Sequence, residues 1–339
     1  MFGRAMRSPT GIGIPVIIIT GFLGAGKTTL IRALLDSAEG ANSAVIVNEF
    51  GEIGIDDALL RAGSEATVLL GNGCLCCRQS SELEATLRGL FIDHSRGAVP
   101  SFERVLIETS GLADPGPILQ SFLAERGLHE TYGLQQVVAV VDAVSGTANL
   151  DSFAEARRQV ALADLIIITK ADLAAPSDVD NLRVALISIN PAARIVLAEH
   201  GKGALQELIS GNITHALAER AADSHASHSA GIGSFALTFD EPLDWTAFSL
   251  TMKTLAALRG ADLLRMKGLL AVKGAEGPVA VHYVQHLAHP PTELKTWPSN
   301  DRRSRLVFIT RDIQRQAVAD LFAATSRLQP SMNTEESHV

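Results

Sequence analysis

The stretch GFLGAGKT, residues Gly21–Thr28, restricts the fold of this 339-residue chain more than any other feature. It matches the pattern G-x-x-x-x-G-K-[ST], in which glycines let backbone N–H groups curl around phosphate oxygens. The apolar run PVIIIT (15–20) before it predicts a short buried parallel strand, and residues 27–37 after it predict a helix. A strand, a glycine-rich turn and a helix in this order indicate a phosphate-binding loop.

Short apolar runs alternate with helix-like segments through the first two thirds of the chain. This alternation predicts an α/β domain in which a mostly parallel sheet has helices on both faces. Ligands of such sheets bind beyond the carboxyl ends of the strands. The predicted strands are 15–20, 44–47, 104–107, 136–141, 165–168 and 194–197, and the predicted helices are 27–37, 81–91, 117–125, 154–161, 177–189 and 204–209.

The pattern changes after AADSHASHSAGIG (221–233), a small and polar segment typical of a linker. The elements beyond it are mixed in order and predict a smaller α+β domain. They are strands at 235–239, 269–272, 279–284 and 305–310, a helix at 245–258 and a second helix that ends near 326. The expected organisation is an N-terminal extension (1–14), a P-loop domain (15–220), the linker (221–233), a C-terminal domain (234–326) and a disordered tail (327–339).

Charge and composition exclude several classes of partner. The net charge of −8 and the pI near 5.7 argue against binding to nucleic acid or to an anionic membrane surface. No run approaches the ~20 apolar residues of a membrane span. The three cysteines all lie within four residues, so they cannot build a disulfide framework. This favours a reducing compartment, and we expect a cytoplasmic protein.

The phosphate-binding loop assigns roles to individual residues. Lys27 is expected to reach the β- and γ-phosphates, and the Thr28 hydroxyl to ligate Mg²⁺. A second acidic element is expected at the end of the strand in VLIETSG, where Glu108 could hold Mg²⁺ through water and the Gly111 N–H could sense the γ-phosphate. The alternative is that Glu108 only caps the end of its strand. The loop's nucleotide-binding candidates are Gly21, Gly24, Ala25, Gly26, Lys27 and Thr28.

The segment TKAD, residues 169–172, follows the strand predicted at 165–168 and indicates the base. The Asp172 carboxylate can accept from the N1–H and N2–H₂ donors of guanine, a pair that adenine lacks. The Lys170 stem would pack on the ring, which makes GTP the expected nucleotide. GTP-binding proteins usually have Asn where this chain has Thr169, so the tie from that amide to the P-loop is expected to be missing. A surface turn is the alternative.

The segment GNGCLCC places Cys74, Cys76 and Cys77 at positions i, i+2 and i+3. Three thiolates can converge on one ion if the backbone bends, and the neighbouring glycines permit that bend. Thiolates select Zn²⁺, Cu⁺ or similar ions, whereas structural zinc sites usually use two separated ligand pairs. The cluster therefore indicates an open, transferable metal site. A redox sensor or buried structural thiols are the alternatives.

The fourth ligand would come from another part of the chain. The segment VNEFGE follows the second predicted strand, where a nucleotide-sensing loop is expected. Glu49 is the first candidate and Glu52 the second, followed by solvent or a client protein.

Together these motifs resemble the CobW-type metallochaperone GTPases. The resemblance rests on GFLGAGKTTL, VNEFGEIGID, GNGCLCC, ETSGLADP and TKAD, and in the second domain on RMKGLL, PVAVHYVQH and RRSRLVFIT. It covers about residues 15–322. It implies an α/β P-loop GTPase domain followed by a smaller α+β domain.

The resemblance also implies an activity. Members of this family bind GTP and Mg²⁺, hydrolyse GTP slowly, hold zinc or a similar ion at the C-x-C-C thiols and pass it to a client apoprotein. Carried over to this sequence, the phosphate role falls on Gly24, Gly26, Lys27, Thr28 and Thr29, the base role on Lys170 and Asp172, and the metal role on Cys74, Cys76 and Cys77, with Glu49 in the metal-associated NEFGE element.

Three other functions share parts of this pattern. One is a cobalt-handling accessory GTPase of cobalamin biosynthesis. Another is a small-molecule kinase with the same P-loop, which TKAD and the thiol cluster argue against. The third is a zinc store or sensor whose metal affinity ignores the nucleotide.

Overall fold

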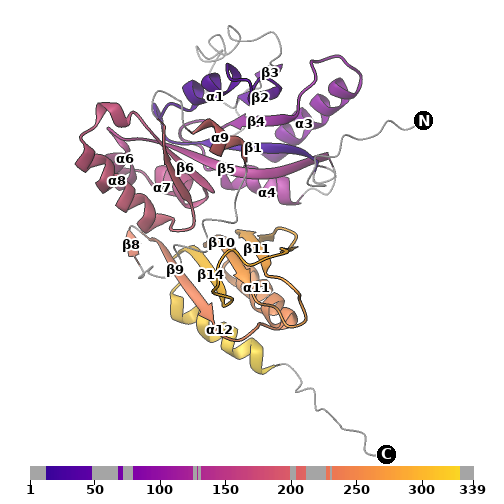
Figure 1. Cartoon of the computed structure of the whole chain (residues 1–339), viewed down its shortest axis with the longest axis vertical. Helices are drawn as coiled ribbons and strands as arrows, with labels where there is room; N and C mark the ends of the chain where they lie inside the picture. Colours follow the sequence, from indigo (N-terminus) through magenta and orange to yellow (C-terminus); the bar gives the residue numbers. More distant parts are fainter. Residues whose placement is uncertain are drawn as a thin grey trace, which may run out of the picture. The chain divides into compact units, whose positions relative to one another are not determined.

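The computed structural model describes residues 13–47, 68–71, 79–124, 128, 131–198, 204–210, 227–229 and 231–328. The chain divides into two compact units, Met1–Arg220 and Ala221–Val339 (Figure 1). Each unit has its own sheet and its own apolar core. No helix among the described residues has the length and apolar character that crossing a bilayer requires.

The first unit is built on a seven-stranded sheet in the order β3-β2-β4-β1-β5-β6-β7, and every pair of neighbours is parallel. The α/β class expected for this unit is confirmed. Its strands are β1 (Ile14–Thr20), β2 (Ser43–Val47), β3 (Val68–Gly71), β4 (Arg104–Glu108), β5 (Tyr132–Asp142), β6 (Leu165–Thr169) and β7 (Arg194–Leu197).

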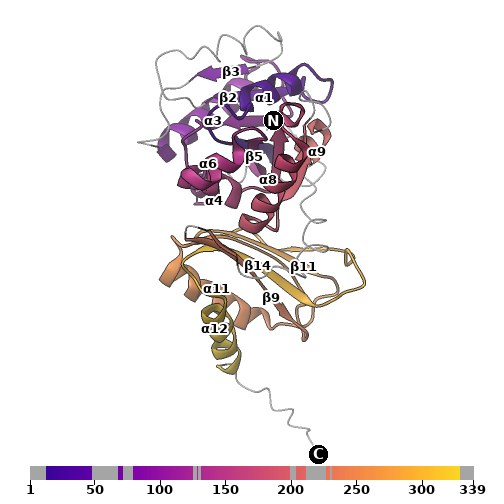
Figure 2. The ribbon, with the colours of Figure 1, turned by 90° about the vertical axis from the view of Figure 1, so that its left-hand side faces the viewer.

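Helices cover both faces of this sheet (Figure 2). One core packs α1 and α9 against the strands, with Ile17 and Ile19 of β1 fully buried beneath Leu30 and Leu34 of α1. Helices α3, α4 and α6 lie on the opposite face. The helices are α1 (Lys27–Leu35), α3 (Gln79–Ser95), α4 (Gly116–Ala124), α6 (Gly146–Ser152), α7 (Ala154–Ala161), α8 (Pro176–Ile189) and α9 (Leu205–Ser210), and η1 (Ala171–Leu173) is a 3₁₀ turn.

Two elements of this unit are absent from the sequence expectation. Strand β3 offers only three apolar residues before Gly71, too few for a recognisable period, and it is a strand because it pairs with β2 from Ala44↔Val68 to Val47↔Gly71. Helix α6 has the sequence GTANLDS, which carries little apolar periodicity.

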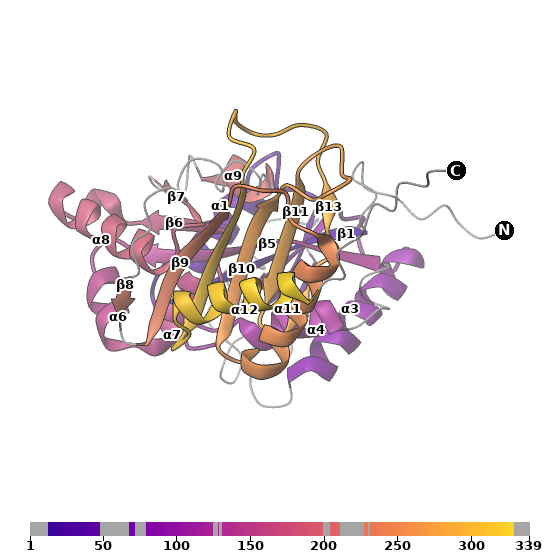
Figure 3. The same cartoon turned by 90° about the horizontal axis from the view of Figure 1, so that it is seen from below.

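The second unit is an antiparallel sheet in the order β12-β11-β10-β14-β9-β8, with β13 paired to β11. Helices α11 and α12 run across one face (Figure 3), and Phe248, Met252 and Phe322 pack there against Phe308. This confirms the α+β class. The elements are β8 (Ser227–Ser229), β9 (Ile232–Phe239), α11 (Trp245–Arg259), β10 (Leu263–Leu270), β11 (Val279–Val284), β12 (Leu287–Ala288), β13 (Thr292–Glu293), β14 (Ser304–Arg311) and α12 (Arg315–Arg327).

Two expectations for this unit need correction. The strand expected at 269–272 is β10, which runs from Leu263 to Leu270. The sequence pattern missed its first half because the buried cations Arg265 and Lys267 interrupt the apolar run. Part of the segment expected to be a linker (221–233) is strand, since β8 pairs antiparallel with the start of β9.

Candidate functional site

The loop between β1 and α1 adopts the backbone that its glycines allow. Gly21, Gly24 and Gly26 have φ values of 144°, 69° and 95°. At Gly21 a Cβ atom would lie 2.2 Å from the Val140 carbonyl oxygen of the neighbouring strand. Only glycine fits this junction, so the loop can leave β1 and turn back into the N-terminus of α1, where free N–H groups attract anions.

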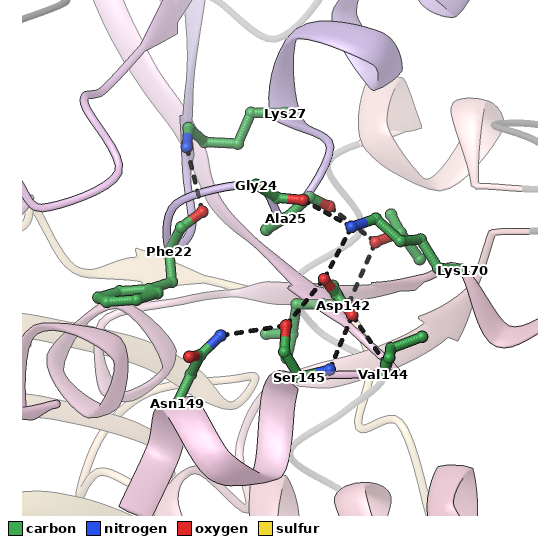
Figure 4. Close-up of polar contacts among 11 residues, drawn as sticks. Phe22, Gly24, Ala25, Lys27, Asp142, Val144, Ser145, Asn149 and Lys170 are labelled. Carbon is green, nitrogen blue, oxygen red and sulfur yellow. Dashed lines mark hydrogen bonds and ion pairs between the residues drawn. The ribbon is translucent and has the colours of Figure 1, made fainter. Parts of the chain in front are cut away.

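Lys27 begins α1 and folds back over the loop. Its side chain is buried, and its Nζ donates to the carbonyl oxygens of Gly21 at 2.9 Å and Phe22 at 3.4 Å (Figure 4 shows the second contact). The ammonium therefore lies within the loop that the glycines form. A phosphate oxygen bound there would offer it a charged acceptor in place of neutral carbonyls.

Thr28 and Glu108 meet although 80 residues separate them. The Thr28 hydroxyl donates to Oε1 of Glu108 at 2.7 Å, and Glu108 is 5% exposed at the end of β4. A hydroxyl and a carboxylate are hard oxygen donors, the type that Mg²⁺ prefers. These two side chains fit a Mg²⁺ ion held beside the phosphate loop.

The register across the sheet aligns four strands at this level. Glu108 pairs with Ile19 of β1 on one side and with Val47 of β2 on the other, and Val47 pairs with Gly71 of β3. Two segments of the chain begin directly beyond this row. One follows Val47 and contains Glu49, and the other follows Gly71 and contains Cys74, Cys76 and Cys77. These four residues lie outside the described part of the chain.

The segment after β6 is tied to the phosphate loop by two side chains. The Thr169 hydroxyl donates to the Ala25 carbonyl oxygen at 2.7 Å. Lys170 has a left-handed backbone (φ 56°), and its Nζ donates to the Gly24 carbonyl oxygen at 2.8 Å. The expectation that the tie at position 169 is missing was wrong, because the shorter threonine reaches the loop that an asparagine amide would reach. Asp172 is exposed in the 3₁₀ turn η1.

Asp142, at the end of β5, pairs with Lys170 and was absent from the candidate residues. Its Oδ2 accepts from Lys170 Nζ at 2.8 Å, and its Oδ1 accepts from the backbone N–H groups of Val144 and Ser145 (Figure 4). Burial alone would raise the pKa of Asp142, but the hydrogen bonds from Lys170, Ser145 and Val144 outweigh it, and the pKa lies below its ordinary value. Sequence carried a signal for Asp142, since it ends an apolar strand in the same way as Glu108.

Gly111, expected to sense the γ-phosphate, packs against the phosphate loop. A Cβ atom at this position would lie 2.6 Å from Leu23 Cδ2 and 2.8 Å from the Leu23 nitrogen. The rings of Phe22 and Phe153, 4.6 Å apart, join the same loop to the start of α7. The loop thus contacts both the segment after β4 and the start of α7.

Residues 15–197 match the family described as CobW/HypB/UreG, nucleotide-binding domain. This chain belongs to the CobW/HypB/UreG family. Residues 232–326 match a second family, described as cobalamin synthesis protein cobW C-terminal domain. Both units of this CobW/HypB/UreG chain therefore have counterparts among known proteins.

Several relatives match nearly the whole of this CobW/HypB/UreG chain. The zinc chaperone YjiA of Escherichia coli is 36% identical, over 91% of this chain and 98% of its own length. The zinc chaperone CobW of Pseudomonas aeruginosa is 34% identical, over 91% and 90%. The crystal structure of Zn(II)-bound YjiA GTPase from E. coli aligns with a TM-score of 0.73 at 31% identity, covering 92% of this chain and 99% of that one.

The structure brings most of the nucleotide candidates of this family member to one edge of the sheet. Lys27, Thr28 and Glu108 are connected by the contacts described above, and Thr169 and Lys170 approach the same loop from β6. Thr29 follows in α1 and is exposed. Among the described residues no hydrogen bond ties Asp172 to the loop, and its exposed carboxylate is accessible to a ligand.

Proposed function

We propose that this chain is a GTP-hydrolysing metallochaperone. It binds zinc or a similar divalent metal at Cys74, Cys76 and Cys77, with Glu49 as fourth ligand, and transfers the metal to a client metalloprotein in a GTP-dependent way. Family membership and the names of the relatives, zinc chaperones and a GTPase, support this proposal. We expect the chain to act in the cytoplasm on a client that receives the metal as an apoprotein.

In this proposal the described residues bind and orient GTP. Lys27 exchanges the carbonyls of Gly21 and Phe22 for β- and γ-phosphate oxygens, while the backbone N–H groups of the loop contact the phosphates. Asp172 accepts from guanine and the Lys170 stem covers the ring. Thr28 and Glu108 would hold Mg²⁺, which when bound neutralises charge on the phosphate oxygens. The Gly111 N–H donates to the γ-phosphate.

The observation that carries the metal part is the row of residues across four strands. Glu108 is paired with Val47, and Val47 with Gly71. The chain continues from Val47 to Glu49 in two residues and from Gly71 to Cys74 in three. A change at the γ-phosphate that displaces β4 relative to β2 and β3 thus acts directly on the starts of both metal-bearing segments.

Coupling between the two sites must be reciprocal. If GTP tightens zinc binding by some factor, zinc tightens GTP binding by the same factor. Hydrolysis then lowers zinc affinity and releases the ion to the client. The thiols must lose protons to bind zinc, so loading weakens as the pH falls.

The division of labour follows the two units. We propose residues 15–220 as the GTPase with its metal site and residues 234–326 as a separate C-terminal domain, with 1–14, 221–233 and 327–339 outside both. The match of residues 232–326 to its own family supports this division. A domain of this kind could dock clients.

A chelator-competition titration of Zn²⁺ tests the proposal. It compares protein with GDP and protein with a non-hydrolysable GTP analogue, both with Mg²⁺, and a variant with Cys74→Ser, Cys76→Ser and Cys77→Ser is the control. We expect the wild type to bind zinc several-fold more tightly with the analogue and the variant to show no difference. Equal zinc affinity in both nucleotide states would instead indicate a store or sensor. The same titration with Co²⁺ addresses cobalt, and a parallel ATP arm addresses kinase chemistry.

A further inference from the structure

Gln159 of α7 clasps the segment that follows β4. Its Nε2 donates to the carbonyl oxygens of Gly111 and Ala113, both at 3.0 Å, and the residue is 1% exposed. Both partners are acceptors, so the amide nitrogen must face them. Both N–H groups of the amide therefore donate to the same short loop.

The oxygen of this amide is buried without a polar contact among the described residues. An apolar side chain of similar size would fill the same space without burying that oxygen. The two hydrogen bonds that Nε2 donates are therefore the polar contacts that this side chain makes among the described residues.

A second contact from α7 holds the same loop. Arg158 pairs with Asp114 at 2.9 Å, and the other carboxylate oxygen of Asp114 accepts from the Gly116 N–H at 2.8 Å, where α4 begins. Arg158 and Asp114 are each about one third exposed. Consecutive residues of one helix thus anchor the loop at its middle and at its end.

Gly111 is held from two sides. On one side it packs on Leu23 of the phosphate loop, and on the other Gln159 fixes its carbonyl. The Ala113 N–H also closes a turn on the Ser110 carbonyl oxygen at 3.0 Å. With these groups fixed, little freedom remains for the peptide that carries the Gly111 N–H.

Helix α7 is itself well anchored. The Phe153 ring beside its first residue lies 4.6 Å from the Phe22 ring, and at the C-terminal end of the helix Asn190 Nδ2 donates to the carbonyls of Val160, Ala161 and Ala163 at 2.7, 3.2 and 2.9 Å. Asn190 is therefore a buried amide like Gln159 that contacts the other end of the same helix and not the loop.

We propose that Gln159 is a positioning residue that lets the chain distinguish GTP from GDP. It aims the Gly111 N–H at the γ-phosphate, and Arg158 supports it from the neighbouring position. This inference rests on the proposed function, because it takes Gly111 as the γ-phosphate contact.

The test measures the Kd of GDP and of a non-hydrolysable GTP analogue, each with Mg²⁺, by fluorescence titration of the full chain. The proteins are the wild type, Gln159→Leu and the control Asn190→Leu, which removes a buried amide that follows α8 and contacts the other end of α7. We expect Gln159→Leu to lower the affinity for the GTP analogue about tenfold relative to the affinity for GDP, which is the effect of one poorly placed hydrogen bond. Asn190→Leu should change both affinities by the same factor, because a purely structural loss does not sense the γ-phosphate.

Three results would overturn the inference. One is an unchanged ratio of the two affinities in Gln159→Leu, and another is an equal change of the ratio in Asn190→Leu. If Gln159→Leu does not fold, Arg158→Met is tested in its place, at a partly exposed position. It should lower the ratio of analogue affinity to GDP affinity about threefold, because a partly exposed ion pair holds the loop less strongly than a buried hydrogen bond. An unchanged ratio in Arg158→Met is the third result that would overturn the inference. A wild type that binds neither guanine nucleotide overturns the proposed function itself.

Discussion

The hydroxyl of Thr169 is one of two side-chain groups that tie the end of β6 to the phosphate loop. It donates to the Ala25 carbonyl oxygen at 2.7 Å. Thr169→Val keeps the shape and removes the donor, so we expect GDP affinity to fall about fivefold to tenfold, the effect of one hydrogen bond of about 1 kcal/mol. Fluorescence titration with labelled GDP measures this. Thr169→Asn is the matched control, since an amide can restore the tie, and equal affinities for Thr169→Val and the wild type would contradict the role.

The ion pair between Asp142 and Lys170 makes the stability of the protein depend on pH. Its pKa is lowered in the folded state, so its contribution is complete above the unfolded pKa of about 4 and is lost as the pH falls through the folded pKa. Asp142→Asn should cost about 1 kcal/mol at pH 7, a small value because the paired Lys170 is 38% exposed.

Urea unfolding of the wild type and of Asp142→Asn at pH 7, 5 and 3.5 measures this dependence. We expect the difference in unfolding free energy to be constant between pH 7 and 5 and to shrink below about pH 4. A difference that stays the same at pH 3.5 would show that charge on Asp142 is not the cause.

At the scale of elements, the loop after β4 and the loop after β1 form one packed unit. Gly111→Ala would place a Cβ atom 2.8 Å from the Leu23 nitrogen and 2.9 Å from its Cα, so the phosphate loop must shift. We expect GTP hydrolysis to fall at least about tenfold, because misplaced phosphate contacts no longer stabilise the transition state. A phosphate-release assay measures the rate.

Gly89→Ala is the matched control for this substitution. Gly89 lies in α3, and a Cβ atom there would meet nothing within 4 Å. Alanine should leave hydrolysis unchanged and stabilise the helix by up to about 1 kcal/mol. Adding Leu23→Ala to Gly111→Ala should not restore activity, because the crowding involves Leu23 backbone atoms. Restored activity in this double variant would show that only side chains clash.

Sequence pattern predicted the bounds of some elements and failed where a partner strand decides. Helix α7 has the predicted range of 154–161, and β11 that of 279–284. Strand β3 could not be predicted, because three apolar residues become a strand only beside β2. Strand β10 was displaced in the prediction, because Arg265 and Lys267 are buried within it and the sequence pattern treats cations as exposed.

At the scale of the whole molecule, each unit has a separate apolar core. We expect two calorimetric transitions, only one of which responds to nucleotide. GDP with Mg²⁺ at about 100 times its Kd should add about 2.7 kcal/mol to the unit that carries the phosphate loop. Met252 is fully buried in the other core, so Met252→Ala should lower the unfolding free energy of the second unit by about 2–5 kcal/mol.

The matched comparison is the response of each transition to the other change. GDP should not change the midpoint temperature of the transition of the second unit, which contains Met252. Met252→Ala should not change the midpoint temperature of the nucleotide-dependent transition. A single transition that responds to both changes would show that the two units unfold together.

By itself the sequence determined the local parts of this protein. The glycines of Gly21–Thr28 are required by backbone sterics, and β-branched runs such as PVIIIT form strands wherever they are buried. These are short-range effects, so the phosphate loop and the α/β class could be predicted without coordinates.

The tertiary structure alone decided which side chains meet. Thr28 finds Glu108, Lys170 finds Asp142, and Gln159 finds the Gly111 carbonyl, over separations of 80, 28 and 48 residues. These pairs depend on the strand order β4-β1-β5-β6, which places the carboxyl ends of distant segments side by side. Strand order results from the packing of the whole sheet, and no local pattern encodes it.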